Sequence, residues 1–136
     1  MLQRTKCPRA RGGRRGAALV ELAICLPVLL LIVYGALEAA GMIFLRQALV
    51  QSAYEAVKIA AKSGNADAAR EAAMDVAEGR NIDQLNVVFT PSDPGSLQRG
   101  SLITVTVSAP GDQSSPLPLG LFRGLTVAAQ AVMVRE

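Results

Sequence analysis

The residues best placed to do chemistry in this sequence lie at the start of a long apolar run, in the stretch RRGAALVELAICLP, residues 14–27. Two arginines and Gly16 precede aliphatic side chains, and one carboxylate, Glu21, follows inside the run. A carboxylate at the centre of a bilayer costs about 2.5–3.5 kcal/mol, and less near the bilayer edge. Exclusion of water also strengthens the attraction of a carboxylate to a cation. Glu21 is therefore a candidate for a specific ion pair.

Other kinds of active site find little support in the sequence. There is no histidine, which excludes histidine-based catalysis and ligation. The cysteines, Cys7 and Cys25, lie in the basic arm and in the apolar run, so neither a disulfide framework nor a metal-binding spacing is present. Asp93 and Asp112 are conceivable calcium ligands, but acids in turns are far commoner. We expect no catalytic residues, no metal and no cofactor.

The apolar run predicts a membrane-spanning helix. Residues 17–45 carry only two charges, Glu21 and Glu38. A helix over residues 17–37 would be about 32 Å long, which matches a hydrocarbon core of about 30 Å. Pro27 lacks a backbone N–H and should bend the helix or loosen it locally.

Charge is distributed unevenly about this run. Six basic residues and no acidic residue precede it, whereas residues 17–136 carry 8 basic and 11 acidic side chains. The six are Arg4, Lys6, Arg9, Arg11, Arg14 and Arg15. Only Arg46 follows the run closely, so the positive-inside rule predicts a cytoplasmic N-terminus and an extracytoplasmic remainder. Nucleic-acid binding by the basic arm is a weaker alternative, because the arm adjoins the apolar run.

Three ordinary interpretations of the run stay open. A cleaved secretory signal would end near the small residues of YGALEAAG, where Glu38 interrupts the pattern. A lipoprotein would use LAIC with Cys25 lipidated, but Ile24 stands where a small residue is usual. An uncleaved single-pass anchor fits the length and the charges and leaves Glu21 unexplained.

The start of the run resembles the processing signal of type IV prepilins. Members of that superfamily carry a short basic leader, a glycine, and a glutamate at the fifth position of the apolar segment. The resemblance implies that a prepilin peptidase cuts after Gly16, so residues 1–16 are the leader and Ala17 is the new N-terminus. A glycine suits a protease that approaches an extended backbone. Pilin shafts often begin with phenylalanine, and Ala17 therefore indicates a minor component.

The fuller pattern is similar to TadE-like minor pilins of tight-adherence pili. The shared features are Glu21, Pro27 within the helix, and Gly35 followed by Glu38 near its end. The stretch GLFRGLTVAAQAVMVRE, residues 120–136, also resembles the last strand of that family. We expect Glu38 to lie near the outer interface as a solvated carboxylate.

The resemblance implies a non-enzymatic minor pilin in the bacterial inner membrane. Its implied partners are prepilin peptidase, a second minor pilin, the major pilin, the inner-membrane assembly platform and membrane lipid, without nucleic acid. Glu21 would pair with the Ala17 amine of a neighbouring subunit and set its register. The alternative is an uncleaved, single-pass envelope protein with a binding head.

The remaining sequence predicts an α+β head. The helix should continue beyond the membrane with an apolar stripe, end at Gly64, and be followed by a second helix that Asn65 caps and that ends near Gly79. The apolar stripe is Leu45, Leu49, Ala53, Ala56 and Ile59. The polar face of the second helix is Asp67, Glu71, Asp75 and Glu78. The expected organisation is a leader (1–16), a transmembrane and assembly helix (17–45) and a head (46–136).

Alternating apolar residues predict three strands, over residues 85–90, 101–109 and 125–134. They should form an antiparallel sheet that packs on the helix. In the connection before the last strand, Pro116 and Pro118 argue against a strand, and Leu119 and Phe122 are expected to pack in the loop.

Overall fold

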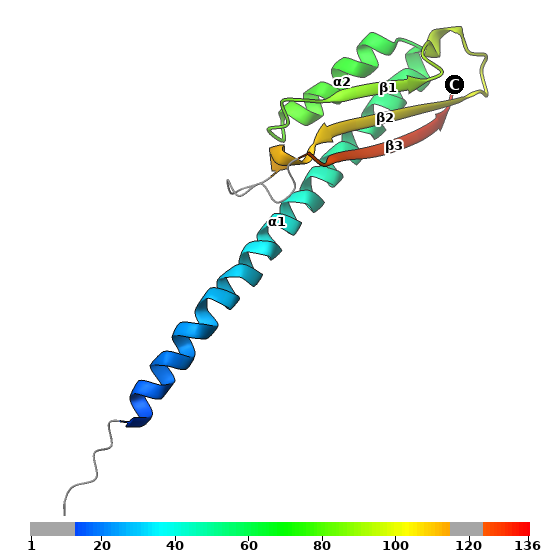
Figure 1. Cartoon of the computed structure of the whole chain (residues 1–136). Helices are drawn as coiled ribbons and strands as arrows, with labels where there is room; N and C mark the ends of the chain where they lie inside the picture. Colours follow the sequence, from blue (N-terminus) through cyan, green and yellow to red (C-terminus); the bar gives the residue numbers. More distant parts are fainter. Residues whose placement is uncertain (1–12, 115–123) are drawn as a thin grey trace, which may run out of the picture. The chain divides into compact units, whose positions relative to one another are not determined.

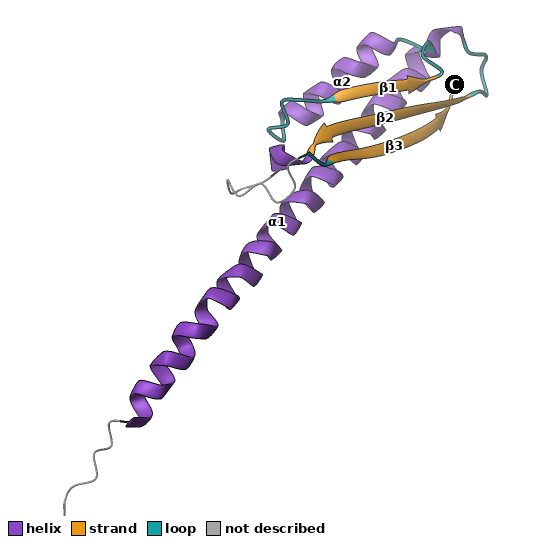
Figure 2. Cartoon of the chain, in the orientation of Figure 1, coloured by secondary structure: helices purple, strands orange, loops and turns teal. Residues whose placement is uncertain are grey.

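The computed structural model describes residues 13–114 and 124–136, with side chains for 16–113 and 124–136. The chain divides into two compact units, Met1–Ala36 and Leu37–Glu136. Along the chain the elements are α1 (Gly13–Ser63), α2 (Ala66–Glu78), β1 (Asn86–Thr90), β2 (Leu102–Pro110) and β3 (Thr126–Val134), as Figures 1 and 2 show. Two short 3-10 turns, Pro94–Ser96 and Gly111–Ser114, lie in the connections. The predicted α+β class is confirmed.

The described part of the N-terminal unit is helix throughout. Residues 13–36 belong to α1, and the α-helix is uninterrupted at Pro27. The proline ring removes the hydrogen bond that an N–H at this position would donate to the carbonyl of Ala23. The bend expected at Pro27 stays a prediction.

In the C-terminal unit, α1 buries the apolar stripe that its spacing predicts. Leu45, Leu49, Ala53 and Ala56 are buried, and Ile59 is partly buried against the same cluster. Residues at this spacing share one helix face, so α1 presents one continuous apolar surface to the sheet and to α2.

The break between α1 and α2 also follows the prediction. Gly64 has a φ of +66°, a left-handed conformation that glycine adopts without strain. The Asn65 side chain then caps α2, because its Oδ1 accepts hydrogen bonds from the N–H groups of Asp67 (2.9 Å) and Ala68 (3.2 Å). The predicted polar face of α2 is exposed, while Ala69, Ala73 and Ala77 are buried.

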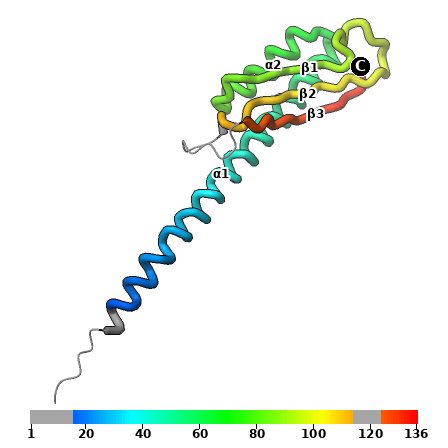
Figure 3. Tube along the Cα trace, viewed as in Figure 1, coloured from blue at the N-terminus to red at the C-terminus, as the bar shows by residue number. Residues whose placement is uncertain are grey.

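The three strands form an antiparallel sheet in the order β1-β2-β3, and their traces lie side by side in Figure 3. The predicted bounds agree with the observed strands to within one residue at each end. The central strand pairs along its whole length with β3, from Leu102 opposite Val134 to Pro110 opposite Thr126. Alternate residues of β1 and β2 are buried, as expected for a sheet with one covered face.

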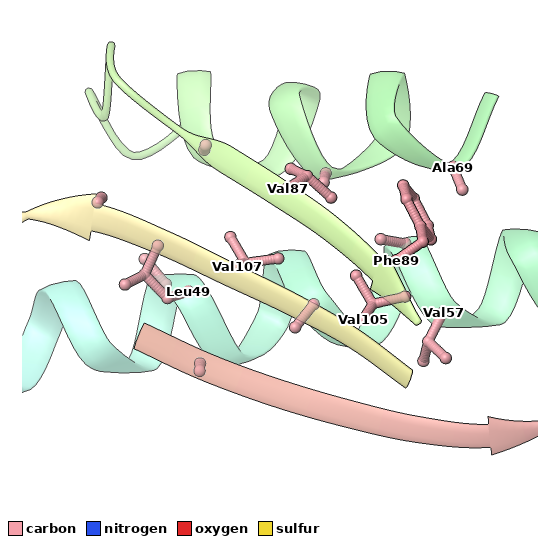
Figure 4. Packing of buried hydrophobic residues seen from close by; sticks show 14 of the residues in the cluster. Leu49, Val57, Ala69, Val87, Phe89, Val105 and Val107 are labelled. Atoms are coloured by element: carbon pink, nitrogen blue, oxygen red, sulfur yellow. The ribbon is translucent and has the colours of Figure 1, made fainter. Parts of the chain in front are cut away.

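The core lies between this sheet and the two helices. In Figure 4, Val87 and Phe89 of β1 and Val105 and Val107 of β2 point towards the helices. They meet Leu49 and Val57 of α1 and Ala69 of α2 in one buried cluster. The expectations for Pro116, Pro118, Leu119 and Phe122 concern residues outside the described part of the chain.

Candidate functional site: the N-terminal helix

The proposed cleavage bond lies in the first turns of α1. The helix begins at Gly13, so Gly16 and Ala17 are both helical, and both are exposed. A Cβ built on Gly16 would meet no heavy atom within 4 Å. Access is therefore open from the side, but a protease that needs an extended backbone must first unwind this turn. The first N–H groups of a helix lack intrahelical acceptors, which makes its end easier to unwind.

Glu21 lies one helical turn beyond Ala17, which places the two residues on the same helix face at a rise of about 6 Å. Its side chain is exposed. The ion pairs of the described residues join Glu55 to Lys58 and Asp67 to Arg70, each at 3.3 Å. Within this part of the chain, Glu21 thus has no cationic partner, and its carboxylate is open to a group from outside.

The apolar side chains around Glu21 are exposed as well. Eleven large hydrophobic residues in the N-terminal unit are between 45% and 75% exposed. They are Leu19, Val20, Leu22, Ile24, Leu26, Val28, Leu29, Leu30, Leu31, Ile32 and Val33. Among the described residues, α1 is the one helix long and apolar enough to cross a membrane. Such a surface is typical of a membrane-spanning helix.

A model of the protein family described as "TadE-like protein" matches residues 16–58. This segment is TadE-like. The match confirms the resemblance found in the sequence and begins at Gly16, the residue suggested as the end of the leader. No curated protein and no solved structure matches the chain.

The TadE-like segment extends beyond the apolar run into the C-terminal unit, and there one expectation is wrong. Glu38 is 1% exposed and not a solvated carboxylate. It precedes Leu45 by seven residues and Leu49 by eleven, so it lies on the same helix face as the buried stripe. That spacing was the signal in the sequence for its burial. Ser52, on the same side of the helix, is also fully buried.

Arg135, just beyond β3, has a role that the sequence did not reveal. Its Nη1 donates hydrogen bonds to the carbonyls of Pro94 and Gly95, both at 2.7 Å, and to that of Leu97. The backbone N–H of Arg135 also donates to the carbonyl of Ser101 at 2.8 Å. One side chain thereby fixes the β1–β2 connection to the end of the sheet. Its partners are backbone atoms of a turn, which leave no residue-type pattern to read.

Acidic residues considered as calcium ligands do not come together. The Asp93 side chain accepts a hydrogen bond from the N–H of Gly95 at 2.9 Å and so acts as a turn cap. Asp112 lies in the short turn after β2. No group of three or more potential metal-ligating side chains occurs among the residues that the structure describes.

A cavity of about 480 Å³ lies beside α1 in the C-terminal unit. Much of its apolar lining comes from Leu37, Phe44, Leu45 and Ile82. Among the described residues, the charged side chain in the lining is that of Arg80. The guanidinium of Arg80 donates to Gln51 Oε1 at 2.7 Å. This lining offers no acid–base pair, so the exposed face of the N-terminal helix is the better candidate for function.

Proposed function

We propose that this chain is a minor pilin of a tight-adherence pilus or a related secretion system. Prepilin peptidase removes residues 1–16, and the remaining helix stays in the inner membrane with the C-terminal unit outside. The protein then acts in the initiation or assembly of the filament. The single observation that supports this most strongly is the TadE-like match, which starts at Gly16 and includes Glu21. The TadE-like family is associated with tight-adherence pili.

Glu21 gives this proposal a physical mechanism. Cleavage would create an ammonium group at Ala17, about one turn from Glu21 on the same helix face. Their exposure leaves both groups available to a neighbouring subunit. The Glu21 carboxylate of one subunit then pairs with the Ala17 amine of the next as the helices exclude water. A misplaced neighbour leaves both charges unpaired, at a cost of several kcal/mol per group.

The exposed aliphatic surface supplies the non-specific part of the association. Before assembly it lies in lipid, and afterwards it packs on other pilin helices, so little net hydrophobic energy separates the two states. Pairing of charges can therefore decide the register of the helices although it is a small part of the buried surface. The partners are prepilin peptidase, a second minor pilin, the major pilin and the assembly platform.

The intact mass of the full chain tests the processing step. Co-expression with prepilin peptidase should lower the mass by residues 1–16. The processed protein should also contain one thiol instead of two, because Cys7 leaves with the leader and Cys25 stays. An unchanged mass would contradict cleavage, and loss of material as far as residue 40 would indicate a secretory signal instead.

Substitution of Glu21 tests the register mechanism separately. Glu21→Ala should still insert and be cleaved but should fail to support pilus formation, because the amine of the neighbour loses its partner. Glu21→Asp is the matched control and should retain part of the function, since it keeps the charge. Normal pilus formation by the Glu21→Ala variant would contradict the register mechanism. It would not contradict cleavage of the leader.

One observation favours an alternative function, that of an uncleaved membrane-anchored envelope protein. The backbone is helical on both sides of the bond between Gly16 and Ala17, whereas proteases bind extended segments. On this reading the basic arm stays attached as a cytoplasmic anchor and the C-terminal unit binds another molecule. The mass measurement separates the two functions.

A further inference from the structure

Two arginines of the C-terminal unit are exposed beside α1. Arg46 belongs to α1, and Arg80 belongs to the turn that follows α2. Within the described part of the chain, neither arginine forms an ion pair with an acidic side chain. Both positive charges are therefore available to an anion from outside the chain.

The two arginines line one cavity of about 400 Å³. Arg80 also lines the cavity of about 480 Å³ beside α1, so the two cavities adjoin at its side chain. Gln51 Oε1 accepts a hydrogen bond from the Arg80 guanidinium at 2.7 Å, which orients this group beside α1. Cavities of this size fall within the range of small-ligand sites, about 300–1,000 Å³. One ligand can thus contact both arginines and extend into the larger cavity.

The surface around the arginines is apolar. Leu37, Ile43, Phe44 and Val50 contribute to the lining of the two cavities and are between 48% and 65% exposed. None of the described residues that line either cavity is acidic. Cationic groups beside exposed apolar side chains are complementary to an amphiphilic anion, in which a charged group is joined to a hydrocarbon chain.

The position of the cavities along the chain favours a membrane lipid as this anion. Leu37 ends the predicted span of residues 17–37, and Arg46 is the first basic residue after it. Nine helical residues cover about 14 Å, so covalent continuity alone keeps Arg46 close to the end of the apolar run. Helical side chains also incline towards the N-terminus of their helix, and that of Arg46 therefore inclines towards Leu37. Basic residues beside a membrane-spanning segment commonly bind anionic lipid headgroups.

We propose that the two cavities form a binding site for an anionic phospholipid of the membrane that the apolar run crosses. The guanidinium groups of Arg46 and Arg80 bind the phosphate, and an acyl chain lies against Leu37 and Phe44 in the larger cavity. The bound lipid thereby links α1 to the turn after α2. This inference relies on the membrane insertion of α1, which is part of the proposed function, and not on cleavage of the leader.

Native mass spectrometry of the full chain in detergent tests the lipid site. Phosphatidylglycerol and phosphatidylcholine with identical acyl chains are titrated into separate samples. Binding of one phosphatidylglycerol should be roughly tenfold or more tighter than binding of phosphatidylcholine, because only the former carries net negative charge. Equal affinities would overturn the proposal. Displacement of the lipid by an equal concentration of glycerol 3-phosphate, which has no acyl chain, would also overturn it and indicate a site for small anions.

Single substitutions locate the site. Arg46→Gln and Arg80→Gln should each weaken phosphatidylglycerol binding roughly fivefold, the contribution of one basic residue at a charged membrane surface, and leave phosphatidylcholine binding unchanged. Arg99→Gln is the matched control, because Arg99 is exposed in the β1–β2 connection and lines neither cavity. Unchanged binding in the first two variants would contradict the proposal. Equal weakening in all three would contradict it as well, since it would indicate general attraction between opposite charges.

Chain extracted from host membranes in mild detergent identifies the natural occupant by its mass. An anionic phospholipid that is retained by the full chain and lost from Arg46→Gln supports the proposal. An acidic polypeptide with the same dependence on Arg46 would overturn it.

The same spectra report whether residues 1–16 are present. A processed chain without preference for phosphatidylglycerol would contradict the lipid site alone. An unprocessed chain with that preference would contradict the proposed function and support the lipid site.

Discussion

Two polar residues of the C-terminal unit, Arg135 and Ser52, differ in whether their side chains have hydrogen-bond partners. Arg135 donates to three backbone carbonyls of one turn. A hydrogen bond that involves a charged group contributes about 1.5–3 kcal/mol, and here the two N–H groups of Nη1 are shared among the three carbonyls. Ser52 represents the opposite case, because its hydroxyl is fully buried and has no hydrogen-bond partner in the described part of the chain.

Replacement of Ser52 by alanine should therefore stabilise the protein. Removal of an unsatisfied hydroxyl and the better helix propensity of alanine together predict a gain of about 0.5–1 kcal/mol in the free energy of unfolding. Thermal unfolding of the full chain in detergent, measured by calorimetry, gives the change in Tm. Ser63→Ala is the control and should lower the Tm. The Ser63 hydroxyl donates to the carbonyl of Ile59 at 2.8 Å and accepts from the N–H of Asn65 at 3.1 Å. A lower Tm for Ser52→Ala would show that the hydroxyl has a partner.

At the scale of elements, the two faces of β2 place consecutive residues in opposite environments, one buried and one exposed. Ile103 is 0% exposed, whereas Leu102 is 62% exposed. Consecutive residues of a strand point to opposite faces, so a slip of one residue would exchange their environments.

Alanine substitutions at these two positions test the register directly. Ile103→Ala should lower the free energy of unfolding by about 2–5 kcal/mol, because it leaves a cavity in the core. Leu102→Ala should change it by less than about 0.5 kcal/mol. Chemical denaturation of the full chain in detergent measures both. Similar losses for the two variants would mean that the outer face of β2 is covered.

The sequence predicted these elements well because their signals are local. The 3.6-residue and two-residue periods, together with Gly64 and Asn65, define the helices, the strands and the break between α1 and α2. The residue type of Glu38 predicts solvation, but its spacing from Leu45 places it on the buried face of α1. The Arg135 contacts could not be predicted, since they depend on how a distant turn packs against the sheet. At the candidate site, the family match covers the segment that contains Glu21. The pairing of the Glu21 carboxylate with the amine of a neighbouring subunit stays a prediction.

For the whole molecule, the important property is which side of the membrane each end occupies. Six basic residues precede the apolar run, and none of the acidic residues does. The positive-inside rule therefore predicts that the sheet lies outside the cytoplasm.

Labelling with a membrane-impermeant maleimide tests this orientation in spheroplasts that lack prepilin peptidase. Gln98 is exposed in the β1–β2 connection, so Gln98→Cys in a Cys7→Ser, Cys25→Ser background should react in intact spheroplasts. The matched control retains Cys7 alone and should react only after lysis. Reaction of Cys7 in intact spheroplasts would contradict the predicted orientation.

The position of Arg135 after β3 has a consequence for how the protein is made. In the proposed orientation, a chain that crosses the membrane with its N-terminal end held in the cytoplasm would deliver the C-terminal part of α1, then α2, β1 and β2, to the far side before β3. Until translocation has passed residue 135, β2 lacks its second neighbour and the carbonyls of Pro94, Gly95 and Leu97 lack their guanidinium. In the proposed orientation the C-terminal unit would therefore be partly folded, with part of its core exposed, until its last strand emerges.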